Sequence, residues 1–280
     1  RLYSLRRKSL GAEMINKKLF GVNKAVVGMI HVDPLPGTPK YKGDVESIIN
    51  KVVKEAIIYK NSGIDAIAIE NMHDIPYLKR NVGPEIISLM SIIGREVKKA
   101  SQLPCGIQIL AGANKEALAA AHSAGMDFIR SEGFVFAHVA DEGIMESDAG
   151  ELLRYRKQIG AENILIFTDI KKKHSSHSIT SDVDIVETAK AAEFFLSDGV
   201  ILTGTSTGKE TDINELKKAR AAVKIPVLIG SGLTADNIGK YFPAADAFII
   251  GSYFKQGGDW RNEVDADRVK ALMNKINKLK

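Results

Sequence analysis

Charged side chains close several apolar runs of this sequence, and their types are those of acid–base catalysis. The candidate catalytic residues are His31, Asp33, Glu70, Arg130 and Asp169, together with Lys173 and His174 just beyond the fifth run. A strand made otherwise of Val, Ile and Leu has no packing reason to end in a charged residue, because a buried charge is costly unless it is paired. Carboxylates, imidazoles and an amine that meet in one place could abstract and return protons.

Two later apolar runs each end in a small turn that contains glycine. The first is VLIGSGL at 227–233 and the second is AFIIGSYF at 247–254. Glycine lets backbone N–H groups approach an anion closely, and TADN at 234–237 is typical of a helix start, which also attracts anions. These features predict a phosphate cradle after the last two strands. Its candidate residues are Gly204, Gly230, Ser231, Gly232, Gly251 and Ser252.

One mechanism for this set is acid–base chemistry on a small phosphorylated sugar or nucleotide. Asp169 or Glu70 would be the general base, and Lys173 or His174 the general acid or electrophile. Isomerase, lyase, aldolase and glycosyl-bond chemistry all fit this inventory. The sixth run, 198–204, offers no lysine for a Schiff base, whereas Lys173 leaves that chemistry open.

A second mechanism is metal-dependent hydrolysis. In it His31 and Asp33, with His174 or His177, would bind a divalent metal that activates water. We favour the first mechanism, because the first run offers H-x-D where metal-dependent barrel hydrolases usually offer H-x-H. In addition, the last run ends in Gly251 and not in a carboxylate. The sequence names no other cofactor.

The elements that must position these residues alternate regularly between strand and helix. A predicted helix follows each apolar run, as parallel strands with right-handed crossovers require. The first run continues into HVDPLPG, which is not the GxGxxG fingerprint of a doubly wound dinucleotide-binding sheet. We therefore predict a single (β/α)8 barrel over residues 21–280. The predicted strands lie at 24–32, 64–71, 105–110, 126–132, 163–170, 198–204, 227–233 and 247–254.

Composition agrees with one soluble barrel. The chain has 280 residues, of which 45% are hydrophobic and 26% charged, which suits one large core. Cys105 is the only cysteine, so a disulfide framework within the chain is impossible. No apolar run approaches the roughly 18 residues that a membrane span requires. Peripheral membrane association and a homo-oligomer stay open.

The first 20 residues differ from the rest of the chain. They contain six basic side chains and one acid, and so account for the whole net charge of +5. Because the excess lies in a tail and not across a domain, the sequence argues against nucleic-acid binding. The Arg- and Ser-containing start RLYSLRRKSL is typical of mitochondrial transit segments. We expect a separable extension over 1–20 and a mitochondrial location, with the cytoplasm as the alternative.

Several long motifs together resemble the BtpA/SgcQ family. They are VVGMIHVDPLPGTPKY, AIAIEN, PCGIQIL, FIRSEGFVFAHVADEGIME, DIKKKHSSH and GVILTGTSTG, and the resemblance covers about residues 20–275. It implies a (β/α)8 barrel that binds phosphate. The family takes its name from a factor needed for photosystem I accumulation. The resemblance therefore also implies an alternative function, a non-catalytic assembly or stability factor for a membrane protein complex.

Overall fold

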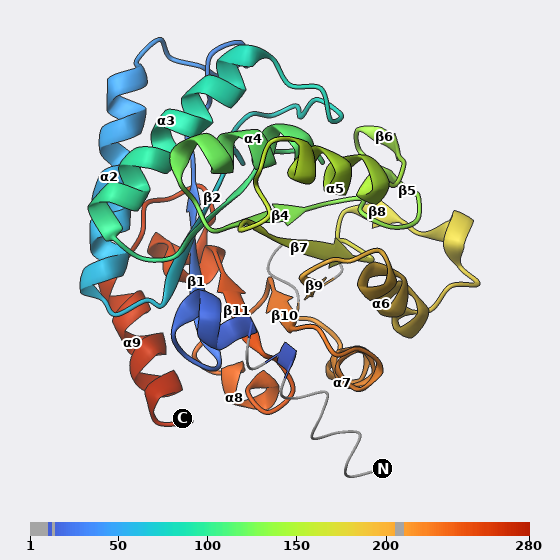
Figure 1. Cartoon of the computed structure of the whole chain (residues 1–280). Coiled ribbons are helices and arrows are strands. Elements are labelled where there is room, and N and C mark those ends of the chain that lie inside the picture. The colour runs from blue at the N-terminus through green and yellow to red at the C-terminus, as the bar shows by residue number, and fades with distance from the viewer. Residues whose placement is uncertain (1–10, 13–14, 205–209) are drawn as a thin grey trace.

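The computed structural model describes residues 11–12, 15–204 and 210–280, and its centre is a closed barrel of parallel strands (Figure 1). The strands follow one another around the barrel in chain order, and β11 closes on β1. Their bounds are β1 (Ala25–His31), β2 (Ala66–Glu70), β3 (Cys105–Gln108), β4 (Phe128–Ser131), β7 (Leu165–Ile170), β9 (Gly199–Thr203), β10 (Val227–Gly230) and β11 (Ala247–Ile250). The predicted (β/α)8 barrel is confirmed.

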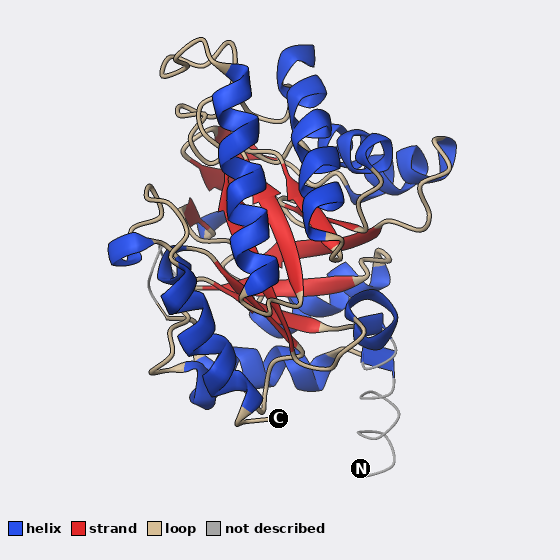
Figure 2. Cartoon of the chain, turned by 90° about the vertical axis from the view of Figure 1, so that its left-hand side faces the viewer, coloured by secondary structure: helices blue, strands red, loops and turns tan. Residues whose placement is uncertain are grey.

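Helices follow the barrel strands and cover the outside of the barrel (Figure 2). Aspartate N-caps fix the starts of several, because a carboxylate accepts hydrogen bonds from the first unpaired N–H groups. Asp44, Asp184, Asp212 and Asp265 each do so. The helices are α2 (Val45–Asn61), α3 (Pro84–Ser101), α4 (Asn114–Ala124), α5 (Ala149–Gln158), α6 (Ile185–Phe194), α7 (Ile213–Ala222), α8 (Ile238–Tyr241) and α9 (Ala266–Asn277).

The core has two layers. Apolar side chains between strands and helices form the larger one, and a smaller cluster fills the inside of the barrel. Phe128 and Phe167 meet edge to face within this inner cluster, with ring centroids 5.6 Å apart. Gly106 makes room for them, since a Cβ there would lie 2.1 Å from the Phe128 ring. The inner cluster closes the barrel below the mouth, as in other filled barrels.

Residues 15–20 form a short helical segment beneath this cluster. Phe20 is 6% exposed and its ring stacks on Phe167 with centroids 6.4 Å apart. Asn16 Nδ2 donates to the Asp246 carbonyl at 3.0 Å. The described part of the predicted extension is therefore packed against the barrel and not separate from it. Residues 1–10, which carry most of the transit-segment prediction, lie outside the described residues.

A small antiparallel sheet forms above the barrel rim, from the long loops after β4 and β7. It contains β5 (His138–Ala140), β6 (Gly143–Met145) and β8 (Ser175–Ser176), with β5 between the other two. The described residues also contain the 3₁₀ turns η1 (Ser178–Thr180), η2 (Ser252–Phe254) and η3 (Gln256–Gly258). No helix among the described residues is both long and apolar enough to cross a bilayer.

Candidate active site

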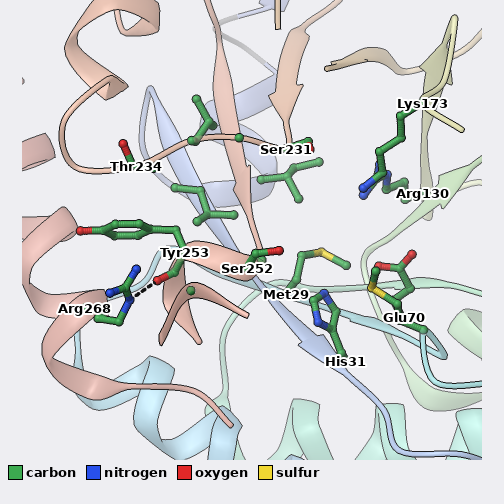
Figure 3. Close-up of a pocket in the computed structure, with 17 residues that line it drawn as sticks. Met29, His31, Glu70, Arg130, Lys173, Ser231, Thr234, Ser252, Tyr253 and Arg268 are labelled. Carbon is green, nitrogen blue, oxygen red and sulfur yellow. Dashed lines mark hydrogen bonds between the residues drawn. The ribbon is translucent and has the colours of Figure 1, made fainter. Parts of the chain in front are cut away.

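A cavity of about 190 Å³ opens at the carboxyl ends of the barrel strands (Figure 3). Side chains from the ends of β1, β2, β4 and β7 form one side, and the turns after β10 and β11 form the other. Of the residues predicted from the sequence, the structure places His31, Glu70, Arg130, Lys173, Ser231, Gly232, Gly251 and Ser252 in its lining.

Glu70 is the last residue of β2 and a buried carboxyl of the cavity. It is 9% exposed, and burial raises its pKa, while the charges of Arg130 and Lys173 oppose that rise. A buried carboxyl with a raised pKa holds its proton more readily than an exposed one, and it can give and take that proton during a reaction. Glu70 therefore suits the role of general acid or base.

Arg130 lines the cavity and forms a bidentate ion pair with Asp169. Its Nε and Nη2 donate to the two Asp169 carboxylate oxygens at 3.2 and 2.9 Å. The Asp169 side chain is only 2% exposed, and it contributes to a second, smaller cavity instead of this one. The geometry assigns Asp169 to orienting Arg130 and offers no free carboxylate for a base at this position.

His31, at the end of β1, is held by a backbone carbonyl. Its Nδ1 lies 2.9 Å from the Trp260 carbonyl oxygen. A carbonyl can only accept, so Nδ1 carries the proton and Nε2 presents a lone pair. Burial, followed by the charge of Lys255, holds the pKa of His31 well below 6.5. His31 is therefore a neutral acceptor whose Nε2 lies 3.1 Å from the position a Cβ on Gly251 would take.

Lys173 follows β7 and is fixed by its surroundings. Its backbone N–H donates to Thr203 Oγ1 at 3.2 Å, and the adjacent Lys172 forms a buried ion pair with Glu132 at 3.0 Å. Figure 3 shows the Lys173 side chain running toward Arg130. Burial lowers the pKa of Lys173, and the Arg130 cation lowers it further.

The turn after β10 has an uncommon backbone conformation. Ser231 and Gly232 both take the left-handed conformation, with φ of 74° and 67°. Asn237 fixes the turn, because its side chain donates to the Gly232 carbonyl at 2.8 Å and accepts from Thr234 N–H at 2.9 Å. Neither the Gly232 N–H nor the Ser252 N–H donates to another described residue. Such N–H groups at neighbouring turns suit a phosphate oxygen.

Arg268, from the first turn of α9, adds a cation beside this cradle. Its Nε donates to the Tyr253 carbonyl at 2.5 Å, and its guanidinium lies 4.5 Å from the centre of the Tyr253 ring. Sequence reasoning missed this residue. The sequence feature that could have indicated it is a basic residue in the first turn of a helix, where the helix dipole disfavours cations. An anion at the site would compensate that position.

Other predicted residues lie outside the cavity. Asp33 forms an ion pair with Lys51 of α2 at 2.6 Å. His174 is exposed, with a left-handed φ of 55°. Gly230 ends β10 and Gly204 follows β9, and neither contributes to the lining.

The metal-site prediction needed His31 and Asp33 to converge with a second histidine. Within residues 11–12, 15–204 and 210–280 no group of three or more His, Cys, Asp or Glu is arranged to hold a metal ion. The physical reason is that His31 Nδ1 is bound to the Trp260 carbonyl, while the Asp33 carboxylate turns outward to Lys51.

The closed parallel sheet, with its cavity at the carboxyl ends of the strands, defines a TIM barrel of the kind that hosts enzymes. The family model described as the BtpA family matches residues 22–278. The chain therefore belongs to the BtpA family, as its motifs predicted.

Two relatives cover nearly the whole chain. A Caenorhabditis elegans protein, uncharacterised and named mitochondrial, is 49% identical over 272 residues, which are 95% of this chain and 98% of that protein. The photosystem I biogenesis protein BtpA of Synechocystis is 33% identical over 255 residues, covering 91% of this chain and 88% of that protein.

Solved structures with the same fold are much more distant in sequence. Thiamine phosphate pyrophosphorylase from Pyrococcus furiosus superposes with a TM-score of 0.57 at 15% identity, covering 95% of this chain and 98% of that one. Phosphoribosyl anthranilate isomerase from Thermus thermophilus gives a TM-score of 0.57 at 12% identity, covering 91% of this chain and all of that one. These similarities show the fold alone.

Proposed function

We propose that this chain is an enzyme acting on a small phosphorylated metabolite by acid–base chemistry. The observation that carries the proposal is the pair of turns after β10 and β11, because Gly232, Ser252 and the cation of Arg268 all line the cavity and neither of the two N–H groups donates to another described residue. Phosphate groups are bound at this place in many TIM barrels. The names of the two superposed enzymes each include a phosphorylated compound. This supports a phosphorylated substrate here and leaves the reaction open.

The roles of the other side chains follow from their environments. Glu70 would exchange a proton with the substrate, and the neutral His31 would accept a hydrogen bond or a proton through Nε2. Arg130, held by Asp169, would stabilise negative charge that develops during the reaction. A scaffold has no need for a buried carboxyl and a half-buried amine beside an anion cradle, because both cost stability.

The test is a thermal-shift screen of the full chain against sugar phosphates, nucleotides and inorganic phosphate. We expect stabilisation by one class of phosphorylated compound, since a ligand that binds only the folded state raises the melting temperature. With the substrate in hand, Glu70→Gln should lower turnover by about a hundredfold or more and change binding much less.

The name of the Synechocystis relative supports a second candidate, a non-catalytic role in the assembly of a membrane protein complex. Indifference to every compound in the screen, together with co-purification of a membrane complex, would favour this candidate over the enzyme.

We also propose a mitochondrial location. The name of the worm relative and the basic residues 1–20 support it. A reporter fused to residues 1–20 should enter mitochondria, and a reporter that stays in the cytoplasm would contradict the proposal.

A further inference from the structure

Lys173 differs from its two lysine neighbours in the direction of its side chain. Lys171 and Lys172 line the smaller cavity on one side of the segment after β7, whereas Lys173 lines the cavity that holds Glu70 and the cradle. The ion pair of Lys172 with Glu132, both about nine-tenths buried, anchors the segment in this orientation. The placement of the Lys173 amine is therefore built into the fold.

The charges around the Lys173 amine also separate it from an ordinary surface lysine. Arg130 of β4 faces it as a second cation, while the nearby carboxylates are those of Glu70, Asp169 and Glu132. Asp169 forms an ion pair with Arg130, and Glu132 forms an ion pair with Lys172. Glu70 is left as the carboxyl whose burial favours its protonated form.

Burial next to another cation is the environment that makes a lysine amine available as a nucleophile near neutral pH. We propose that Lys173 forms a Schiff base with the carbonyl carbon of a small phosphorylated ketone or aldehyde bound in this cavity. This inference rests on the proposed function, because the cradle would hold the phosphate of the same molecule.

The chemistry balances with the groups present. The neutral Nζ attacks the carbonyl carbon, and the π electrons move to oxygen, giving a carbinolamine after proton transfer from nitrogen. Glu70 donates a proton to the hydroxyl, water leaves, and an iminium ion remains. When an adjacent C–H or C–C bond breaks, its electron pair moves into the iminium and leaves an enamine. The Glu70 carboxylate takes up the released proton, which comes from the C–H bond or, when a C–C bond breaks, from the hydroxyl of the fragment that departs as a carbonyl compound. Glu70 then returns a proton to the enamine carbon, which restores the iminium. Hydrolysis then restores the amine and a carbonyl, and no oxidant or reductant is needed.

The cavity geometry limits the substrate class. In Figure 3 Arg268 lies on the left, Ser231 and Ser252 lie near the centre, and Lys173, Arg130 and Glu70 lie on the right. The volume of about 190 Å³ is below the range of roughly 300–1,000 Å³ of typical ligand pockets. A short carbonyl phosphate fits this arrangement better than a nucleotide.

The experiment is reductive trapping on the full chain. Dihydroxyacetone phosphate and glyceraldehyde 3-phosphate serve as ketone and aldehyde probes, and sodium cyanoborohydride reduces the iminium to a stable amine. Intact mass and peptide mapping should show one adduct per chain, on Lys173, with at least one probe. Excess inorganic phosphate should slow its formation.

Three variants make the result specific. Lys173→Met should lose the adduct, while Lys171→Met, a matched control two residues away, should keep it. Lys173→Arg keeps the cation, so it should bind inorganic phosphate like the wild type and still give no adduct. Melting curves of all three variants establish that each is folded.

Absence of a Lys173 adduct with both probes would overturn the inference, as would labelling that Lys173→Met leaves unchanged. Calorimetry with inorganic phosphate separates this failure from failure of the proposed function. Phosphate binding without an adduct would remove the Schiff base and leave the cradle. An adduct on Lys173 without phosphate binding would remove the cradle.

Discussion

Replacing His31 by asparagine should change how the stability of the protein depends on pH. His31 is buried, and its pKa in the folded protein lies well below 6.5. The unfolded chain therefore binds a proton in acid that the folded chain does not bind. The stability contributed by neutral His31 is present above pH 6.5 and is lost as the pH falls toward its folded-state pKa.

The magnitude follows from this difference. One proton taken up only by the unfolded state, with a pKa of 6.5, costs about 2 kcal/mol of unfolding free energy between pH 8 and pH 5. His31→Asn removes this titration, while the asparagine amide can still donate to the Trp260 carbonyl. Other groups, such as His73 with a pKa lowered to about 4 by burial, contribute equally to the pH dependence of both proteins. Their contributions therefore cancel in the difference between the two unfolding free energies.

The assay is urea unfolding followed by circular dichroism at pH 5, 6, 7 and 8. The free-energy difference between wild type and His31→Asn should change by about 2 kcal/mol across this range, with the wild type losing more in acid. His122→Asn, on the exposed surface of α4, is the matched control for the loss of a histidine. Parallel pH dependences for wild type and His31→Asn would refute a folded-state pKa of His31 well below 6.5.

Two further predictions concern the stability contributed by buried contacts. Lys255→Met breaks a buried ion pair of 2.9 Å with Glu55 and should cost about 3–5 kcal/mol in urea unfolding, because it leaves the Glu55 charge without its partner. Adding Glu55→Gln should recover much of that loss, and a single variant within about 1 kcal/mol of wild type would contradict the argument. Phe20→Ala should cost about 3 kcal/mol, since this ring is buried against Phe128 and Phe167. Chains starting at residue 11 and at residue 21 should therefore differ in melting temperature, and equal melting temperatures would show that the segment is dispensable.

The fold could be predicted from the sequence because each buried parallel strand is a short apolar run with a helix after it. Residues that end a strand, such as His31 and Glu70, were also predictable, since the ends of parallel strands meet at one mouth. Asp33 lies two residues beyond its strand, and His174 four. Strand periodicity does not determine where such side chains point, and these two turn to α2 and to solvent.

Contacts between distant segments were beyond sequence reasoning. The Trp260 carbonyl that orients His31 comes from a loop 229 positions away. Arg268 reaches the cradle from the first turn of the last helix, which the strand-end argument does not cover. The pairing of Asp169 with Arg130 likewise depends on a contact between two neighbouring strands, which the sequence of either strand alone does not show.

The central claim is a phosphate site at the carboxyl ends of β10 and β11, and calorimetry with inorganic phosphate on Gly232→Asp tests it most directly. Gly63→Asp is the matched control, because Gly63 also has a positive φ, 78°, and lies before β2 at the opposite end of the barrel. We expect the carboxylate at 232 to weaken phosphate binding by about a hundredfold or more, since like charges brought together cost several kcal/mol. Gly63→Asp should bind phosphate like the wild type. Equal affinity in Gly232→Asp and the wild type would contradict the account.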